Sequence, residues 1–266
     1  MQAAVEICRS PGERVALVVQ QIAADAIERR GAFTIAIAGG SLVKMLGAMV
    51  AIPGVQWEKW HVAWVDERCL PHADKESNCG CAREAWLDHV PIPASQVHAI
   101  DETLCRGGSG GAAVAQAAAL DYESRLRAIP EAVLPRSAAG LPAFDLLLLG
   151  FGPDGHICSL FPGHALLSDG SDRWVLPIWD SPKPPPERIT LSMQTVNTAA
   201  KVVLVGIGDG KKEIVKAAFA PGCDLPCAKA HGASPEVERP TWILDEAAAS
   251  SLALEELTTC DVKRLP

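Results

Sequence analysis

A mostly apolar run in the middle of the chain, residues 144–149, in which Asp145 is the one charged residue, constrains the fold more than any other feature. The run has the length of a β-strand, and glycine and proline end it abruptly before Asp154 and His156. Continuous apolar character is typical of a strand buried on both faces of a parallel sheet. In open α/β sheets, ligands bind in the crevice outside the carboxyl ends of such strands. Asp154 and His156 are therefore candidates for chemistry.

Strand-like and helix-like patterns alternate along the whole chain. Residues 12–30 repeat apolar side chains at helical spacing before Gly31, a typical C-terminal cap, and Asp245 is expected to begin a last helix. Further strand-like runs occur at residues 33–38, 61–65, 188–191, 201–207 and 241–244. This alternation predicts one α/β domain over residues 1–266, with a mostly parallel sheet covered by helices on both faces.

The composition excludes several classes of protein. A net charge of -8 argues against a nucleic-acid partner, which requires concentrated lysine and arginine. Nine cysteines, an odd count without repeated spacing, indicate the reduced thiols of an intracellular protein. The first residues lack a secretory pattern, and no apolar run reaches the length of a membrane span. We therefore expect a cytoplasmic protein that binds no membrane.

Glycine-rich turns join two of the strand-like runs to helical patterns. Gly39, Gly40 and Ser41 form the first turn, and the second precedes Lys211 and Lys212. The free amides at the start of a helix attract anions, and glycine lets the backbone approach them closely, so a phosphate would fit the first turn. The alternative is a tight turn in which Ser41 only caps the helix.

Charged residues follow the strand-like run at residues 61–65. Asp66 and Arg68 either lie in a solvated loop or face the same crevice as the first glycine turn. Ser77 or Asn78 is expected to cap the helix that comes next. The proline-rich segment at residues 181–187 is interpreted as a stiff connector.

Two motifs suggest cofactors that we do not expect. Residues 150–155 match GxGxxG, but Pro153 and Asp154 favour a turn there, and a carboxylate would repel a dinucleotide's pyrophosphate. Cys223, Cys227 and His231 lack a fourth ligand at useful spacing for a metal ion. The sequence therefore predicts neither a cofactor nor a metal.

Taken together, the motifs resemble those of the 6-phosphogluconolactonases, in the family's order over nearly the whole chain. The matching segments are AGGS at residues 38–41, VDER at 65–68 with SN at 77–78, LGFGPDGHICSLFPGH at 149–164, RITLS at 188–192 and GDGK at 208–211. The resemblance implies a Rossmann-like fold shared with the glucosamine-6-phosphate deaminases. It also implies hydrolysis of a sugar-phosphate lactone, 6-phospho-D-glucono-1,5-lactone, to 6-phosphogluconate in the pentose phosphate pathway, without a cofactor.

The resemblance also assigns roles to residues. It places the phosphate on the first glycine turn and makes His156 the general base, which Asp154 would orient. Arg68, near Asp66, would stabilise the oxyanion or orient the lactone. The expected substrate-binding residues are Gly39, Gly40, Ser41, Asn78, His164, Arg188 and Lys211. Two choices stay open at this point: whether His156 or His164 is the base, and whether Lys211 or Lys212 reaches the phosphate.

Three alternatives to a lactonase remain. A sugar-phosphate deaminase or isomerase resembles this chain, but its central loop carries a glutamate where Phe161 stands here. A non-catalytic sugar-phosphate sensor would have the same fold, and a serine hydrolase would use Ser41. We expect a monomer or a weak homodimer.

Overall fold

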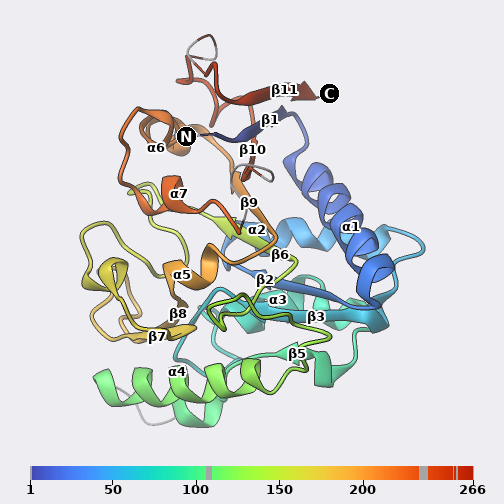
Figure 1. Ribbon diagram of the computed structural model, residues 1–266, viewed down its shortest axis with the longest axis vertical. Coiled ribbons are helices and arrows are strands. Elements are labelled where there is room, and N and C mark those ends of the chain that lie inside the picture. The colour runs from blue at the N-terminus through green and yellow to red at the C-terminus, as the bar shows by residue number, and fades with distance from the viewer. Residues whose placement is uncertain (1, 106–109, 234–238, 254, 256, 266) are drawn as a thin grey trace.

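A parallel β-sheet forms the centre of the molecule (Figure 1). The computed structural model describes residues 2–105, 110–233, 239–253, 255 and 257–265. The sheet has eight strands in the order β11-β1-β10-β9-β6-β2-β3-β5, and every neighbouring pair is parallel. The strands are β1 (Ala4–Cys8), β2 (Phe33–Ile37), β3 (Trp60–Trp64), β5 (Val97–His98), β6 (Leu146–Gly150), β9 (Lys201–Gly206), β10 (Thr241–Leu244) and β11 (Asp261–Leu265).

A second, antiparallel sheet has three strands in the order β4-β8-β7. These strands are β4 (Asp66–Arg68), β7 (Val175–Ile178) and β8 (Arg188–Leu191). The helices are α1 (Pro11–Arg30), α2 (Ser41–Met45), α3 (Asn78–Ala85), α4 (Gly111–Arg127), α5 (Met193–Val196), α6 (Lys212–Phe219) and α7 (Pro226–Lys229). Gly31 ends α1 with a φ of 76°, and its N–H donates to the Ile27 carbonyl, as expected for a left-handed cap.

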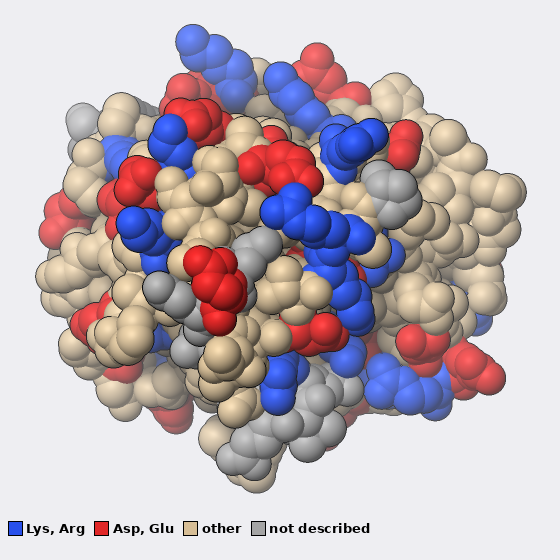
Figure 2. All heavy atoms as spheres, turned by 90° about the horizontal axis from the view of Figure 1, so that it is seen from above, with Lys and Arg blue, Asp and Glu red and all other residues tan. Residues whose placement is uncertain are grey.

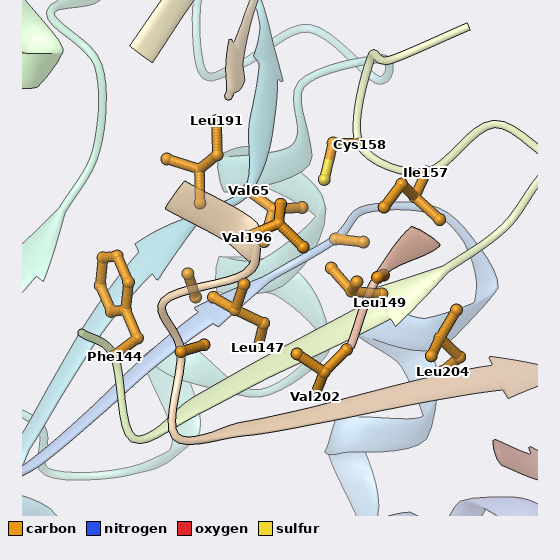
Figure 3. Packing of buried hydrophobic residues seen from close by; sticks show 14 of the residues in the cluster. Val65, Phe144, Leu147, Leu149, Ile157, Cys158, Leu191, Val196, Val202 and Leu204 are labelled. Carbon is orange, nitrogen blue, oxygen red and sulfur yellow. The ribbon is translucent and has the colours of Figure 1, made fainter. Parts of the chain in front are cut away.

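Apolar side chains cover both faces of the parallel sheet. Because successive side chains of a strand point to opposite faces, β6 sends Leu146 and Leu148 into one core cluster and Leu147 and Leu149 into the other. Figure 3 shows Leu147 and Leu149 in one layer with side chains of β9, and Ile157 and Cys158 near the carboxyl end of β6. Full burial of each leucine contributes about 1.5–3 kcal/mol. The loop after β6 therefore packs, through Ile157 and Cys158, against the hydrophobic core.

A buried carboxylate fixes the register of the central strands at their other end. Asp145, just before β6, accepts two hydrogen bonds from the Arg30 guanidinium, at 2.8 and 2.6 Å. It also accepts bonds from the backbone N–H and hydroxyl of Thr34 in β2, at 2.8 and 2.9 Å. Charge-assisted bonds of this kind are about twice as strong as neutral ones. They hold β2 beside β6.

The predicted α/β fold with a mostly parallel sheet is confirmed, but several details of the prediction are wrong. Asp66 to Arg68, for which the sequence left a solvated loop as one alternative, form a strand, and residues 188–191 pair with it in the antiparallel sheet. Gly40 occupies the cap position of α2, and Ser41 is its first helical residue. Turns, not a helix, follow Asp245. The sequence also gave no signal for β1, β7 or β11, because these strands are short or carry charged residues.

Candidate active site

The carboxyl ends of β2 and β6 form the switch point of the parallel sheet. The chain leaves β2 toward β3 on one side, whereas from β6 it goes on to β9 on the other side. Two diverging connections leave a crevice at this point, which is where α/β sheets bind ligands. Gly39 to Ser41 follow β2, and the loop with Asp154 and His156 follows β6.

A cavity of about 300 Å³ lies in this crevice. It brings together nine of the predicted site residues, which are Gly39, Gly40, Ser41, Asp66, Arg68, Asn78, His156, Arg188 and Lys211. Asp154 lies beside the cavity, in contact with His156. Segments far apart in sequence therefore meet at one site, as the sequence predicted.

The loop after β6 holds His156 tightly. The N–H of Gly152 donates to the His156 carbonyl at 2.8 Å, and a Cβ on Gly152 would collide with the imidazole. The Phe161 ring lies against the imidazole, with 4.6 Å between centroids. Pro153 and Asp154 form the predicted turn, so no helix begins within the GxGxxG match. The imidazole therefore has little freedom to rotate.

Asp154 orients the imidazole from one side. Its Oδ1 is 2.5 Å from His156 Nδ1, a separation that requires a proton between the two atoms. If Nδ1 carries that proton, Nε2 has a free lone pair. Burial lowers the pKa of His156, and Asp154 opposes this shift. Burial raises the pKa of Asp154, but its contacts with His156 and Lys183 outweigh this and bring it to about 2. The pair thus combines an ionised carboxylate with an imidazole whose neutral form is favoured by burial.

Lys183 is a site residue that the sequence analysis missed. Its Nζ is 3.1 Å from Asp154 Oδ2 and 3.1 Å from His156 Nδ1. It lies in the proline-rich segment at residues 181–187, which we interpreted only as a connector. Prolines stand on both sides of Lys183 in the sequence. This pattern does not predict that the lysine side chain contacts the loop after β6.

Three cations line the cavity. Arg188 is buried, and burial lowers the pKa of its guanidinium, with Arg68 adding to the effect. Nε of Arg68 is buried and has no hydrogen-bond partner within the described residues. Burial also lowers the pKa of Lys211, whose Nζ donates to the Phe151 carbonyl. Lys212 points away, and its ammonium pairs with Asp209 at 2.8 Å. The site therefore favours an anionic ligand.

Asp66 and Asn78 connect the first glycine turn to the loop after β6. Asn78 Nδ2 donates to the Asp66 carbonyl at 2.9 Å, and Ser159 Oγ donates to Asp66 Oδ2 at 2.7 Å. A Cβ on Gly39 would collide with the Asn78 side chain, so only glycine fits there. Arg68 lines the same cavity as Asp66, and its Nη1 donates to the Glu76 carbonyl at 2.8 Å.

Glu67 is the second residue that the sequence analysis missed. Its carboxylate accepts from the backbone N–H groups of Arg68, Asn78 and Cys79, each at 2.7 Å. Ser77 caps α3 as predicted, since its hydroxyl accepts from the Gly80 N–H. Burial raises the pKa of Glu67 to about 7, against the effect of these amides. Two of these amides, those of Asn78 and Cys79, open α3, where the helix dipole also favours a negative charge.

His164 lies outside the cavity. Its Nδ1 accepts from the Leu166 N–H at 3.2 Å, and its Nε2 is 3.1 Å from Asp180 Oδ1. Both ring nitrogens are therefore engaged in holding loops together. Of the two histidines left open by the sequence, only His156 lines the cavity.

The surface gives no further indication of a ligand. In Figure 2, basic and acidic side chains are interleaved on the face seen from above. Among the described residues, no group of three or more His, Cys, Asp or Glu side chains is placed to hold a metal ion. Within the same residues, no helix combines the length and the apolar character needed to cross a membrane.

Comparison with known proteins gives consistent matches. A family model for glucosamine-6-phosphate isomerases and 6-phosphogluconolactonase matches residues 11–242. The chain is 44% identical over 230 residues to "6-phosphogluconolactonase 3, chloroplastic" of Arabidopsis thaliana, covering 85% of this chain and 67% of that protein. It spans 62% of a chloroplastic relative from rice, Oryza sativa subsp. indica. It is 39% identical over 245 residues to a probable 6-phosphogluconolactonase 5 of Arabidopsis thaliana, covering 90% and 94% of the two chains.

Solved structures agree with these matches. The 6-phosphogluconolactonase from Trypanosoma brucei superposes with a TM-score of 0.79 at 26% identity, over 95% of this chain and 99% of that one. The enzyme from Leishmania guyanensis gives a TM-score of 0.76 at 27% identity, over 95% and 100%. A monomeric glucosamine-6-phosphate deaminase shares the fold at 17% identity. The chain therefore belongs to the family of glucosamine-6-phosphate isomerases and 6-phosphogluconolactonases.

Proposed function

We propose that this protein is a 6-phosphogluconolactonase. It hydrolyses 6-phospho-D-glucono-1,5-lactone to 6-phospho-D-gluconate, a step of the oxidative pentose phosphate pathway. The names of the relatives support this activity. The observation that carries the proposal is a single cavity in which His156, oriented by Asp154, shares space with Arg68, Arg188 and Lys211.

The cations and the glycine turn would bind the phosphate. Lys211 and Arg188 supply fixed positive charge, and the backbone at Gly39, Gly40 and Ser41 allows close approach. Because α2 has only five residues, the two cations contribute most of the attraction. Binding the phosphate fixes the position of the lactone carbonyl at the other end of the substrate, which lowers the entropic part of the barrier.

His156 acts as the general base in the first step. Its Nε2 takes a proton from a water molecule, whose oxygen attacks the lactone carbonyl carbon. Asp154, hydrogen-bonded to Nδ1, stabilises the imidazolium that forms. The carbonyl oxygen becomes an oxyanion, and the guanidinium of Arg68, whose Nε has no hydrogen-bond partner among the described residues, stabilises it.

The second step opens the ring. The tetrahedral intermediate collapses, the bond between the carbonyl carbon and the ring oxygen breaks, and the imidazolium returns its proton to that oxygen. The products are a carboxylic acid, which ionises, and a sugar hydroxyl. No covalent enzyme intermediate is needed, because a lactone is already an activated ester.

The alternatives receive less support from the site. In place of the glutamate of the deaminases, Phe161 puts a buried ring against His156. Ser41 lines the cavity, but none of the histidine contacts above involves it, as activation of a nucleophilic serine would require. A sensor would not need an oriented base. The cytoplasmic location and the monomer or weak homodimer stay predictions, and two of the relatives above are named chloroplastic.

An assay with two substrates tests the proposal. The full chain is mixed with 6-phosphogluconolactone or with plain gluconolactone at controlled pH, and acid release is corrected for spontaneous ring opening. We expect catalysed hydrolysis with a kcat/KM much higher for the phosphorylated lactone. Absence of catalysis at micromolar protein would overturn the proposal and favour a sensor.

A further inference from the structure

The ammonium group of Lys183 contacts the catalytic pair, although no step of the proposed mechanism uses it. Its Nζ lies 3.1 Å from Asp154 Oδ2, 3.2 Å from Asp154 Oδ1 and 3.1 Å from His156 Nδ1. Lys183 precedes β8, whereas Asp154 and His156 follow β6. A positive charge thus reaches the base from a separate part of the chain.

The backbone around Lys183 is held in place by several hydrogen bonds. The guanidinium of Arg188 donates to the carbonyls of Lys183 and Pro185, at 2.7 and 2.9 Å. Ser181 Oγ also donates to the Lys183 carbonyl, at 2.8 Å. The backbone position of Lys183 is therefore built into the fold, which places its side chain within reach of Asp154 and His156.

The three contacts allow only one arrangement of protons. If Lys183 donated to Nδ1, that atom would present a lone pair to Asp154 at 2.5 Å, and two acceptors would repel. Because the pKa of Asp154 is lowered to about 2, its carboxyl group is ionised, and the proton between it and the imidazole belongs to Nδ1. Lys183 then donates to the carboxylate oxygens, and its charge lies beside the ring without a hydrogen bond to it.

We propose that Lys183 is a positioning residue whose ammonium offsets the charge of Asp154, so that the carboxylate orients His156 without making it cationic. This inference rests on the proposed lactonase function, because it concerns the base of that reaction. A lone carboxylate at 2.5 Å would favour the imidazolium, which cannot accept a proton. With Lys183 present, Nε2 stays available in weakly acidic solution.

Two carboxylates act on His156, so a nearby positive charge is needed to keep the imidazole neutral. Asp154 and Asp66 both raise the pKa of His156, whereas Lys183 lowers it in the same direction as burial. Lys183 also lowers the pKa of Lys211, whose Nζ donates to the Phe151 carbonyl in the same loop. Lys183 is the cation that the structure places against the ring itself, within the residues it describes.

NMR titration of the histidine rings in the full chain tests the inference without substrate. The His156 signal is assigned by its absence in His156→Gln. We expect its pKa to rise by about one unit in Lys183→Met and to stay near the wild-type value in Lys183→Arg. Lys183→Gln serves as a second variant if Lys183→Met folds poorly. An unchanged His156 pKa in the folded neutral variants would overturn the inference.

Kinetics supply a second readout. The acid limb of kcat/KM should move up in pH by the same amount in Lys183→Met, while Lys212→Met, which removes a lysine outside the cavity, leaves it in place. A raised KM with an unchanged acid limb would make Lys183 a substrate contact and contradict the inference. If the wild-type protein hydrolyses no lactone, the proposed function fails, and the NMR titration still decides whether Lys183 sets the state of His156.

Discussion

Arg68 lies directly opposite Arg188 in the antiparallel pair of β4 and β8. Like charges at facing positions of two strands destabilise a sheet. The effect is visible at Arg188, where burial and the charge of Arg68 both lower the pKa of the guanidinium. Asp66 and Glu76 act in the opposite direction and raise it. An anionic ligand between the two guanidinium groups would therefore reduce their repulsion.

Ligand binding should stabilise the protein, and the phosphate should account for most of the effect. At a concentration about 100 times its Kd, a ligand adds about 2.7 kcal/mol to the free energy of unfolding. For a chain of this size we expect 6-phosphogluconate to raise Tm by about 5 to 10 °C in a calorimetric scan. Gluconate at the same concentration and ionic strength should give little shift. Equal shifts from both compounds would show that the cations do not select the phosphate.

Glu67 should stabilise the start of α3 and, through it, the cavity. In Glu67→Ala, three backbone N–H groups lose their acceptor, and each buried unsatisfied donor costs about 1 kcal/mol or more. We expect the free energy of unfolding in urea to fall by about 2–4 kcal/mol. Glu67→Gln keeps an acceptor and should lose less than half of this. Equal losses in the two variants would contradict the role of the acceptor oxygen.

The stacked pair of His61 and His98 should make stability depend on pH. Their nitrogens are 3.1 Å apart, so one ring must be neutral to accept, and burial lowers the pKa of His98 to about 4. An unfolded histidine binds a proton near pH 6.5, so this contribution is complete above that pH and is lost as the pH falls toward 4. Its upper limit is about 3 kcal/mol.

Urea unfolding at several pH values measures this contribution. We expect the free energy of unfolding to fall more steeply between pH 6.5 and pH 4 in the wild type than in His98→Gln. His89→Gln alters an exposed ring and should keep the wild-type slope. If the free energy of unfolding falls equally steeply with pH in His98→Gln and in the wild type, the pair of His61 and His98 is not the source of the pH dependence.

The parallel sheet could be predicted because short apolar segments of the sequence indicate its central strands. Residues 146–149 and 202–205 are apolar without interruption, and runs of this length bounded by glycine are typical of buried strands. Since the carboxyl ends of parallel strands share one edge, the predicted meeting of the first glycine turn with the loop after β6 followed from topology and is confirmed by the cavity. The single domain over residues 1–266 stays a prediction.

The missed residues depend on contacts that no local pattern records. In the sequence, Glu67 is one of three adjacent charged residues. Its role as an acceptor for the Asn78 and Cys79 amides depends on the packing of α3 against β4. Lys183 sits among prolines without periodicity, and only the antiparallel pairing of β7 with β8 brings that segment to His156. Both residues act through tertiary contacts, which a single sequence does not reveal.

The kcat of a His156 variant tests the central claim most directly. If Nε2 of His156 activates water, His156→Ala should lower kcat by about 10²- to 10⁴-fold, the usual contribution of a general base. Calorimetric titration with 6-phosphogluconate should give nearly the wild-type Kd for this variant, because the phosphate contacts remain. A His156→Ala protein that binds 6-phosphogluconate and keeps the wild-type kcat would contradict the account.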